Sequence, residues 1–206
     1  ALSRARLYTG CGPLGRSRYK GILVGDDMKE TPILQVNELT KRYGATTALE
    51  GVSVAFRRGE VHALVGENGA GKSTLSKIIA GAVQPTEGTL TIKGQTVTGL
   101  SPMQAKKLGI SMVYQEFNLV PELPVYENLF IGKELRNGPV IRRAEMIRRS
   151  QEIFETMGVT LNCESRIKDL SVAYCQLVEI AKALLDDSEV LILDEPTAPI
   201  TNKEVE

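Results

Sequence analysis

The most informative stretch for the fold is Gly66-Glu67-Asn68-Gly69-Ala70-Gly71-Lys72-Ser73, which matches G-x-x-x-x-G-K-[ST] without a gap. It follows a strand-like run, Val61-His62-Ala63-Leu64-Val65, and precedes a segment with helical apolar spacing, 73–82. A loop with few side chains lets successive backbone N–H groups point at one anion. The stretch therefore predicts a loop that binds the phosphates of a nucleoside triphosphate.

Within this loop each residue type has an expected task. Lys72 supplies a positive charge to the β- and γ-phosphates, the Ser73 hydroxyl is placed to bind Mg²⁺, and Thr74 reaches the α-phosphate. The alternative is a glycine-rich turn that only connects strand to helix. The candidate ATP contacts are Gly66, Glu67, Asn68, Gly69, Ala70, Gly71, Lys72, Ser73 and Thr74.

A second motif lies near the other end of the chain, where Val190-Leu191-Ile192-Leu193 is followed by Asp194 and Glu195. A buried strand would place Asp194 at its carboxyl end, where ligands bind in α/β sheets, and there it would hold Mg²⁺. Glu195 would polarise the attacking water as general base. The alternative is an ordinary strand that ends in solvated acids.

Periodicity between the two motifs alternates between strand and helix. We expect strands within 33–65, at 89–93, at 110–114 and at 190–193, and helices at 102–108 and 142–157. Ser171 is expected to cap a further helix with an apolar face of Leu177, Ile180, Ala181 and Leu184. This alternation predicts an α/β core with a parallel sheet.

Composition excludes some classes of function. The 206 residues carry 25 basic and 25 acidic side chains, so no general attraction to nucleic acid is expected. No apolar run reaches the roughly 20 residues of a membrane span. Cys11, Cys163 and Cys175 are far apart and are expected to be reduced. The only histidine, His62, is interpreted as a strand residue.

The two ends of the chain differ from the middle. Residues 1–27 are basic and glycine-rich, which indicates a disordered or non-native extension. Residues 28–206 are interpreted as one domain. Its sequence stops just after the Asp194-Glu195 motif, so we expect the domain to be incomplete at its C-terminus.

Four segments in this order resemble the ATP-binding cassette (ABC) family: 66–73, Val113-Tyr114-Gln115-Glu116, Leu170-Ser171-Val172-Ala173-Tyr174 and Asp194-Glu195-Pro196-Thr197. The resemblance implies an α/β P-loop NTPase fold, an ABC-type nucleotide-binding domain with an antiparallel β subdomain and a helical subdomain at about 101–168. It also implies a second cassette, fused or dimeric.

By the same resemblance Gln115 senses Mg²⁺ and the γ-phosphate, Ser171 contacts the γ-phosphate held by the opposite cassette, and Tyr43 stacks on adenine. Gln115 can instead be a polar strand end, and Tyr43 a core or surface residue. Two departures stand out: Val172 and Ala173 replace the usual glycines, and Ala198-Pro199-Ile200-Thr201 replaces the usual D-loop.

The sequence around these motifs is similar to that of the ATPase subunits of ribose-, xylose- or galactose-type importers. The similar segments are 67–74, 114–119, 127–132 and 178–184. That similarity implies ATP hydrolysis at the cytoplasmic face of the membrane, a permease partner and, indirectly, a sugar-binding protein, with no nucleic acid. Two alternatives stay open: a fragment that binds ATP without hydrolysing it, and a soluble ABC ATPase outside transport.

Overall fold

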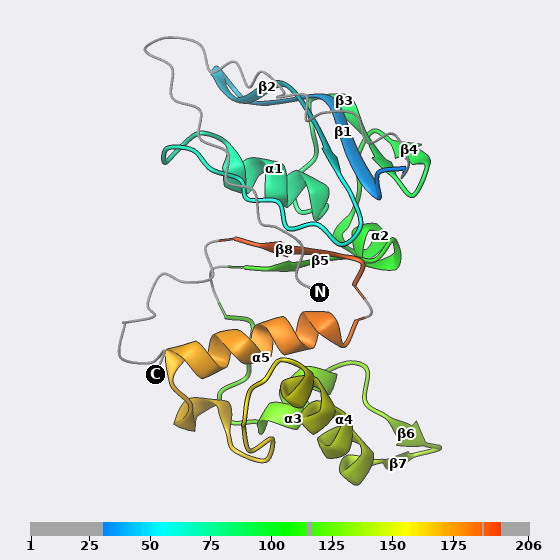
Figure 1. Ribbon diagram of the computed structural model, residues 1–206, viewed down its shortest axis with the longest axis vertical. Helices are drawn as coiled ribbons and strands as arrows, with labels where there is room; N and C mark the ends of the chain where they lie inside the picture. The colour runs from blue at the N-terminus through cyan, green and yellow to red at the C-terminus, as the bar shows by residue number, and fades with distance from the viewer. Residues whose placement is uncertain (1–30, 115–116, 187, 195–206) are drawn as a thin grey trace. The chain divides into compact units, whose positions relative to one another are not determined.

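The computed structural model describes residues 31–114, 117–186 and 188–194, which fall into two compact units divided after Ile110 (Figure 1). The predicted extension 1–27, the predicted catalytic residues Gln115 and Glu195, and the segment 198–201 lie outside the described residues.

The first unit is built on an antiparallel sheet. Its strands are β1 (Leu34–Tyr43), β2 (Thr46–Phe56), β3 (Glu87–Ile92) and β4 (Gln95–Val97), in the order β2-β1-β3-β4. Leu34 lies opposite Ile92 and Val36 opposite Leu90, and all four side chains are buried. Alternate residues thus form one apolar face. The antiparallel sheet implied by the family resemblance is confirmed in this unit, whereas the parallel pairing predicted from strand–helix alternation is found in the second unit.

Two helices complete this unit: α1 (Lys72–Ile79) and α2 (Pro102–Lys107). Leu75, Ile78 and Ile79 bury one face of α1. Ser101 begins α2 with a capping box: its hydroxyl accepts from the Gln104 amide, and the Gln104 side chain accepts from the Ser101 amide. The helices predicted at 73–82 and 102–108 are confirmed apart from their ends.

The strand predicted at 61–65 is wrong for the described structure. The segment has a single bridge position, at His62, and Val61 and Val65 are 81% and 53% exposed. A strand needs backbone partners, and the four-stranded sheet described above forms without this segment. His62 instead contacts the Phe56 ring edge-on and pairs with Glu60.

The second unit pairs β5 (Ile110–Val113) with β8 (Val190–Leu193). Ser188 contacts Ser111 at one end, and the Asp194 amide donates to the Val113 carbonyl at the other. The order of these contacts shows that the two strands run in the same direction. β8 is only half-buried, with Leu193 45% exposed, so the prediction of a buried strand is wrong here. Among the described strands it has only β5 as a neighbour.

Helices make up the rest of this unit: α3 (Val125–Phe130), α4 (Arg143–Thr156), a 3₁₀ turn (Ile167–Asp169) and α5 (Val172–Leu184), with a small hairpin of β6 (Arg136–Asn137) and β7 (Val140–Ile141). Their core includes Leu129, Met146, Phe154, Cys163 and Val178. Both described cysteines, Cys163 and Cys175, are free, as predicted, and both are buried. Burial raises the pKa of the Cys163 thiol to about 11.

Helix α5 faces the core with a different set of residues from the predicted one. Cys175, Val178 and Ala181 are buried, whereas Leu184 is 41% exposed. The buried set lies at i, i+3 and i+6, so the helix is rotated relative to the predicted face of Leu177, Ile180, Ala181 and Leu184. These buried residues of α5 belong to the same apolar core as residues of α3 and α4.

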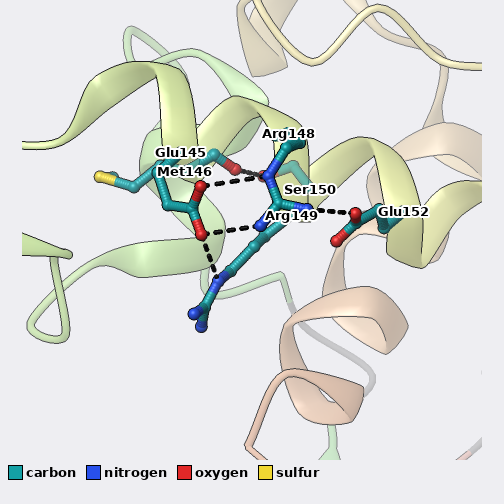
Figure 2. A network of polar contacts seen from close by, with 6 residues as sticks. All are labelled: Glu145, Met146, Arg148, Arg149, Ser150 and Glu152. Atoms are coloured by element: carbon teal, nitrogen blue, oxygen red, sulfur yellow. Dashed lines mark hydrogen bonds and ion pairs between the residues drawn. The ribbon is translucent and has the colours of Figure 1, made fainter.

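The outer face of α4 carries a charged network (Figure 2). Glu145 accepts hydrogen bonds from Arg148, at 2.8 and 3.1 Å, and from Arg149, at 3.1 Å, and Arg148 also pairs with Glu152. The hydrogen bonds from Arg148 and then Arg149 lower the pKa of Glu145 to about 2. Met146, Ser150 and Phe154 on the opposite face are buried.

This network predicts a pH-dependent contribution to stability. A lowered folded-state pKa means that the ionised form stabilises the fold above the usual value of 4.5, and that this stabilisation fades as the pH falls towards about 2. Glu145→Gln should therefore lower the melting temperature at neutral pH, by an amount that shrinks in acid. Thermal unfolding at several pH values measures this. Glu155→Gln, at an exposed site on the same helix, is the control. A Glu145→Gln deficit independent of pH would contradict the assignment.

Candidate phosphate-binding site

The loop before α1 turns tightly through two glycines. Gly69 and Gly71 have φ of +85° and +91°, in the left-handed region that glycine adopts without strain. The Ala70 amide donates to the Glu67 carbonyl at 3.1 Å, and Gly71 caps α1. A Cβ on Gly71 would lie 2.6 Å from the Ala48 carbonyl oxygen and from the Leu49 side chain. The loop is thus pressed against β2, and only glycine fits there.

The ammonium group of Lys72 lies against the backbone of the same loop. Its ammonium group donates to the carbonyls of Gly66, at 2.8 Å, and Glu67, at 3.0 Å. The first turn of α1 contains no acidic residue, so the positive end of the helix dipole and the lysine charge add together. Ser73 and Thr74 lie half-buried in that first turn. These features together suit a phosphate group.

Tyr43 is the other predicted contact in the first unit. It ends β1 and the residue is 49% exposed, with the Lys41 ammonium 4.8 Å from the ring centroid. The exposed ring excludes the alternative of a core residue. Its stacking on a base stays a prediction.

Asp194 directly follows β8, and its backbone is fixed by the hydrogen bond to Val113. Because β5 and β8 are parallel, Asp194 and the residues that follow Val113 emerge at the same edge of this sheet. The described ends of the two strands, Val113 and Asp194, therefore lie at one edge of this sheet. Gln115 and Glu195 follow these ends in the sequence. Their own side chains lie outside the described residues.

Ser171 caps α5, as predicted. Its hydroxyl accepts from the Tyr174 amide at 3.5 Å. Val172 and Tyr174, which stand at or beside the usual glycine positions, expose 44% and 39% of their surface at this helix end. Side chains therefore surround the N–H groups that the family resemblance assigns to a phosphate.

The predicted contacts are divided between the two units. The loop 66–74 and Tyr43 belong to the first, and Asp194 and Ser171 to the second. Their joint action on one nucleotide therefore stays a prediction. No group of three or more His, Cys, Asp or Glu residues within the described ranges could hold a metal ion by itself. No helix within these ranges is long and apolar enough to cross a membrane.

Sequence reasoning missed the side chains that hold the segment after Gln115. The fully buried Asn128 and the buried Glu179 bind backbone groups between Asn118 and Pro124. The available signal was a polar residue within each of two otherwise apolar helix faces, since such residues are buried only when they find partners. Asn128 and Glu179 lie in 127–132 and 178–184, two of the segments that are similar to sugar importers, so these contacts give both segments a structural role.

An antiparallel sheet, a glycine-lined loop that opens a helix and a parallel strand pair ending in Asp194 together define a P-loop nucleotide-binding domain. The family model described as ABC transporter matches residues 49–198, which is more than half of the chain. This chain therefore belongs to the ABC transporter family.

Relatives and solved structures agree with this assignment. A putative ribose/galactose/methyl galactoside import ATP-binding protein of Agrobacterium fabrum is 46% identical over 84% of the chain and 34% of its own length. A ribose import ATP-binding protein of Rubrobacter xylanophilus is 47% identical over 84% and 35%. The chain spans about a third of the length of these relatives. The ADP conformation of MJ1267, an ATP-binding cassette of an ABC transporter, superposes with a TM-score of 0.72 at 29% identity, covering 84% of this chain and 72% of that one.

The close approach of Gly71 to β2 gives a direct test of the loop. We expect Gly71→Ala to lower the free energy of unfolding by roughly 1–3 kcal/mol or more, because strain at positive φ adds to the clash with the Ala48 carbonyl. Gly69→Ala is the matched control, since its φ is similar but its Cβ would meet nothing within 4 Å. Urea unfolding measures both variants. Equal losses would show that the loop is not pressed against β2.

Proposed function

We propose that this chain is part of the ATP-binding subunit of an ABC importer, which binds and hydrolyses Mg-ATP to drive monosaccharide uptake through a membrane permease. The observation that carries the proposal is the loop itself, where Gly69, Gly71 and Lys72 build a compact, positively charged turn at the start of α1. The names of its relatives, which are ribose or galactose import ATP-binding proteins, support the choice of transport and of sugar.

ATP would be held mainly by the first unit. Backbone N–H groups from Gly66 to Thr74 would surround the phosphates, and Lys72 would exchange its carbonyl contacts for the β- and γ-phosphates. Tyr43 would stack on adenine. The Ser73 hydroxyl, Asp194 and Gln115 supply hard oxygen ligands of the kind that Mg²⁺ prefers. When bound, Mg²⁺ neutralises charge on the phosphate oxygens.

Hydrolysis would use the acids and the glutamine of the second unit. Glu195 would accept a proton from the attacking water, and Gln115 would orient that water and report the γ-phosphate to the permease. Ser171 would contact the γ-phosphate on a second cassette, either fused or dimeric, because the start of α5 carries a partial positive charge. Such a subunit would sit at the cytoplasmic face of the membrane, with a sugar-binding protein as an indirect partner.

A second candidate function has a specific observation in its favour. Val172, at a position where the family usually has glycine, and the nearby Tyr174 expose bulky side chains at the helix end that would face phosphate. If they block approach, the chain binds ATP without hydrolysing it. A soluble ABC ATPase outside transport has no observation in its favour among the described residues.

Two substitutions in the full-length protein separate binding from turnover. Lys72→Ala should raise the dissociation constant for Mg-ATP at least about 100-fold, because it removes the charge at the phosphates. Glu195→Gln should leave affinity within about threefold and lower kcat at least about 100-fold. Lys77→Ala, an exposed lysine in the last turn of the same helix, is the control and should change neither. Calorimetric titration and phosphate release measure these values.

The outcomes distinguish the candidates. Unchanged ATP affinity in Lys72→Ala would contradict the nucleotide site. Tight binding by a wild type that shows no turnover would favour the hydrolysis-deficient alternative. Loss of uptake of one labelled monosaccharide after deletion of the gene, with recovery by the wild type but not by Glu195→Gln, would confirm the transport role.

A further inference from the structure

Tyr43 stands at a tight turn of the first unit, where its backbone is fixed and its side chain is open to solvent. It ends β1 opposite Thr46 of β2, and Gly44 and Ala45 form the turn between them. Gly44 has a φ of +56°, which glycine adopts without strain. The residue Tyr43 is 49% exposed. An aromatic ring in such a place can stack on a flat ligand.

A cation from the same strand covers one face of this ring. Lys41 Nζ lies over the Tyr43 ring, 4.8 Å from its centroid. An ammonium group within about 6 Å of the centroid is attracted by the negative face of the ring. Within the described part of the chain, Lys41 pairs with no carboxylate, and no other ring or charged group contacts Tyr43. The ring is therefore the partner of this ammonium group.

The next residue along the strand uses its charge differently. The Arg42 guanidinium pairs with the carboxylate of Glu87, and the Arg42 amide donates to the Thr86 hydroxyl at 3.0 Å. Glu87 is the first residue of β3, so Arg42 is tied to the neighbouring strand. Two adjacent cations thus have separate partners, and only the charge of Lys41 is directed at the ring.

The Lys41–Tyr43 pair shares its hairpin with the contact that fixes the phosphate loop. Lys41 lies opposite Leu49 in the register of β1 and β2. A Cβ on Gly71 would lie 2.6 Å from the Leu49 side chain, so the loop rests on this same part of β2. The ring and the loop both belong to the first unit. One hairpin therefore supports the two contacts that a nucleotide would use.

Holding the ring in advance favours binding of a base. An exposed tyrosine without a partner samples several side-chain rotamers, and ordering such a side chain during binding lowers affinity. The Lys41 ammonium already holds the ring and leaves the opposite face for a base. A base on that face would also exclude water from the ring, which strengthens its attraction for the ammonium group.

We infer that Lys41 is a positioning residue for the nucleobase, which holds the Tyr43 ring with one face covered so that adenine stacks on the other. This inference rests on the proposed function, which assigns adenine to Tyr43. Lys41 acts through the ring and contacts no phosphate. Its removal should therefore weaken the binding of ligands that carry a base, and leave the binding of a polyphosphate without a base unchanged.

A double-mutant cycle in the full-length protein, followed by calorimetric titration with Mg-ATP, tests this inference. Lys41→Met keeps the aliphatic stem and should raise the dissociation constant about 3- to 10-fold. In a Tyr43→Ala background the same change should alter it less than about 1.5-fold, because no ring remains to be held. Lys41→Arg should stay within about twofold of the wild type, because a guanidinium also stacks on an aromatic face.

A second probe and a control separate the ring contact from general effects of charge. Competition by Mg-tripolyphosphate, which has no base, should differ less than about 1.5-fold between Lys41→Met and the wild type. Arg42→Met is the matched control: it removes the neighbouring cation, which pairs with Glu87, and should leave affinity for Mg-ATP within about 1.5-fold. Lys41→Gln also removes the charge and replaces Lys41→Met if that variant does not fold.

Losses from Lys41→Met and Tyr43→Ala that multiply would overturn this inference alone, and so would unchanged affinity for Mg-ATP in Lys41→Met. An equal loss of affinity for Mg-tripolyphosphate would also overturn it, because that result would show direct contact with phosphate. A Tyr43→Ala variant that binds Mg-ATP as tightly as the wild type would overturn the adenine contact in the proposed function, and this inference with it.

Discussion

The turn at Gly69-Ala70-Gly71 is the constraint on which the first unit's site depends. Positive φ at both glycines, the Ala70–Glu67 hydrogen bond and close contact with β2 leave one path for the chain into α1. That path gathers backbone N–H groups at the start of a helix whose first turn lacks acids, with the Lys72 ammonium held above them. The positive potential at the start of α1 therefore comes from the geometry of the backbone, and the Lys72 side chain adds a full positive charge to it.

The second unit solves a different problem, which is to fix groups at the end of a short strand pair. β5 and β8 run in parallel, so residues after Val113 and after Leu193 emerge at one edge. Before α3, the described residues 117–124 form no helix or strand, and Asn128, Glu179 and Lys182 bind their backbone groups. Buried polar side chains here specify the course of a loop, a task that apolar packing performs poorly because it has no direction.

Much of this arrangement could be predicted from sequence. The G-x-x-x-x-G-K-[ST] pattern predicted the start of α1, because its glycines allow the tight turn and its lysine supplies a charge for phosphate. Ser101 and Ser171 indicated helix starts because their hydroxyls can accept from backbone amides. The prediction of a strand at 61–65 was wrong because an apolar run shows only that a segment can join a sheet. It does not show whether a neighbouring strand is present. The face of α5 was misjudged because the apolar spacing of Leu177, Ile180 and Leu184 outweighed Cys175 and Val178, which are the buried residues, whereas Leu184 is 41% exposed. The bond from the Asn118 amide to Glu179 spans 61 residues, so a polar residue on an apolar helix face can mark Glu179 in the sequence, but nothing local identifies its partner.

The central claim is that the backbone of the loop, from Gly66 to Thr74, is what receives the phosphates. Amide hydrogen exchange across residues 66–75 of the full-length protein, with and without saturating Mg-ATP, measures this directly. The account predicts that these amides slow by roughly tenfold or more when nucleotide binds, since each would gain a phosphate partner or lose access to water. Saturation with ATP that leaves their exchange unchanged would contradict it.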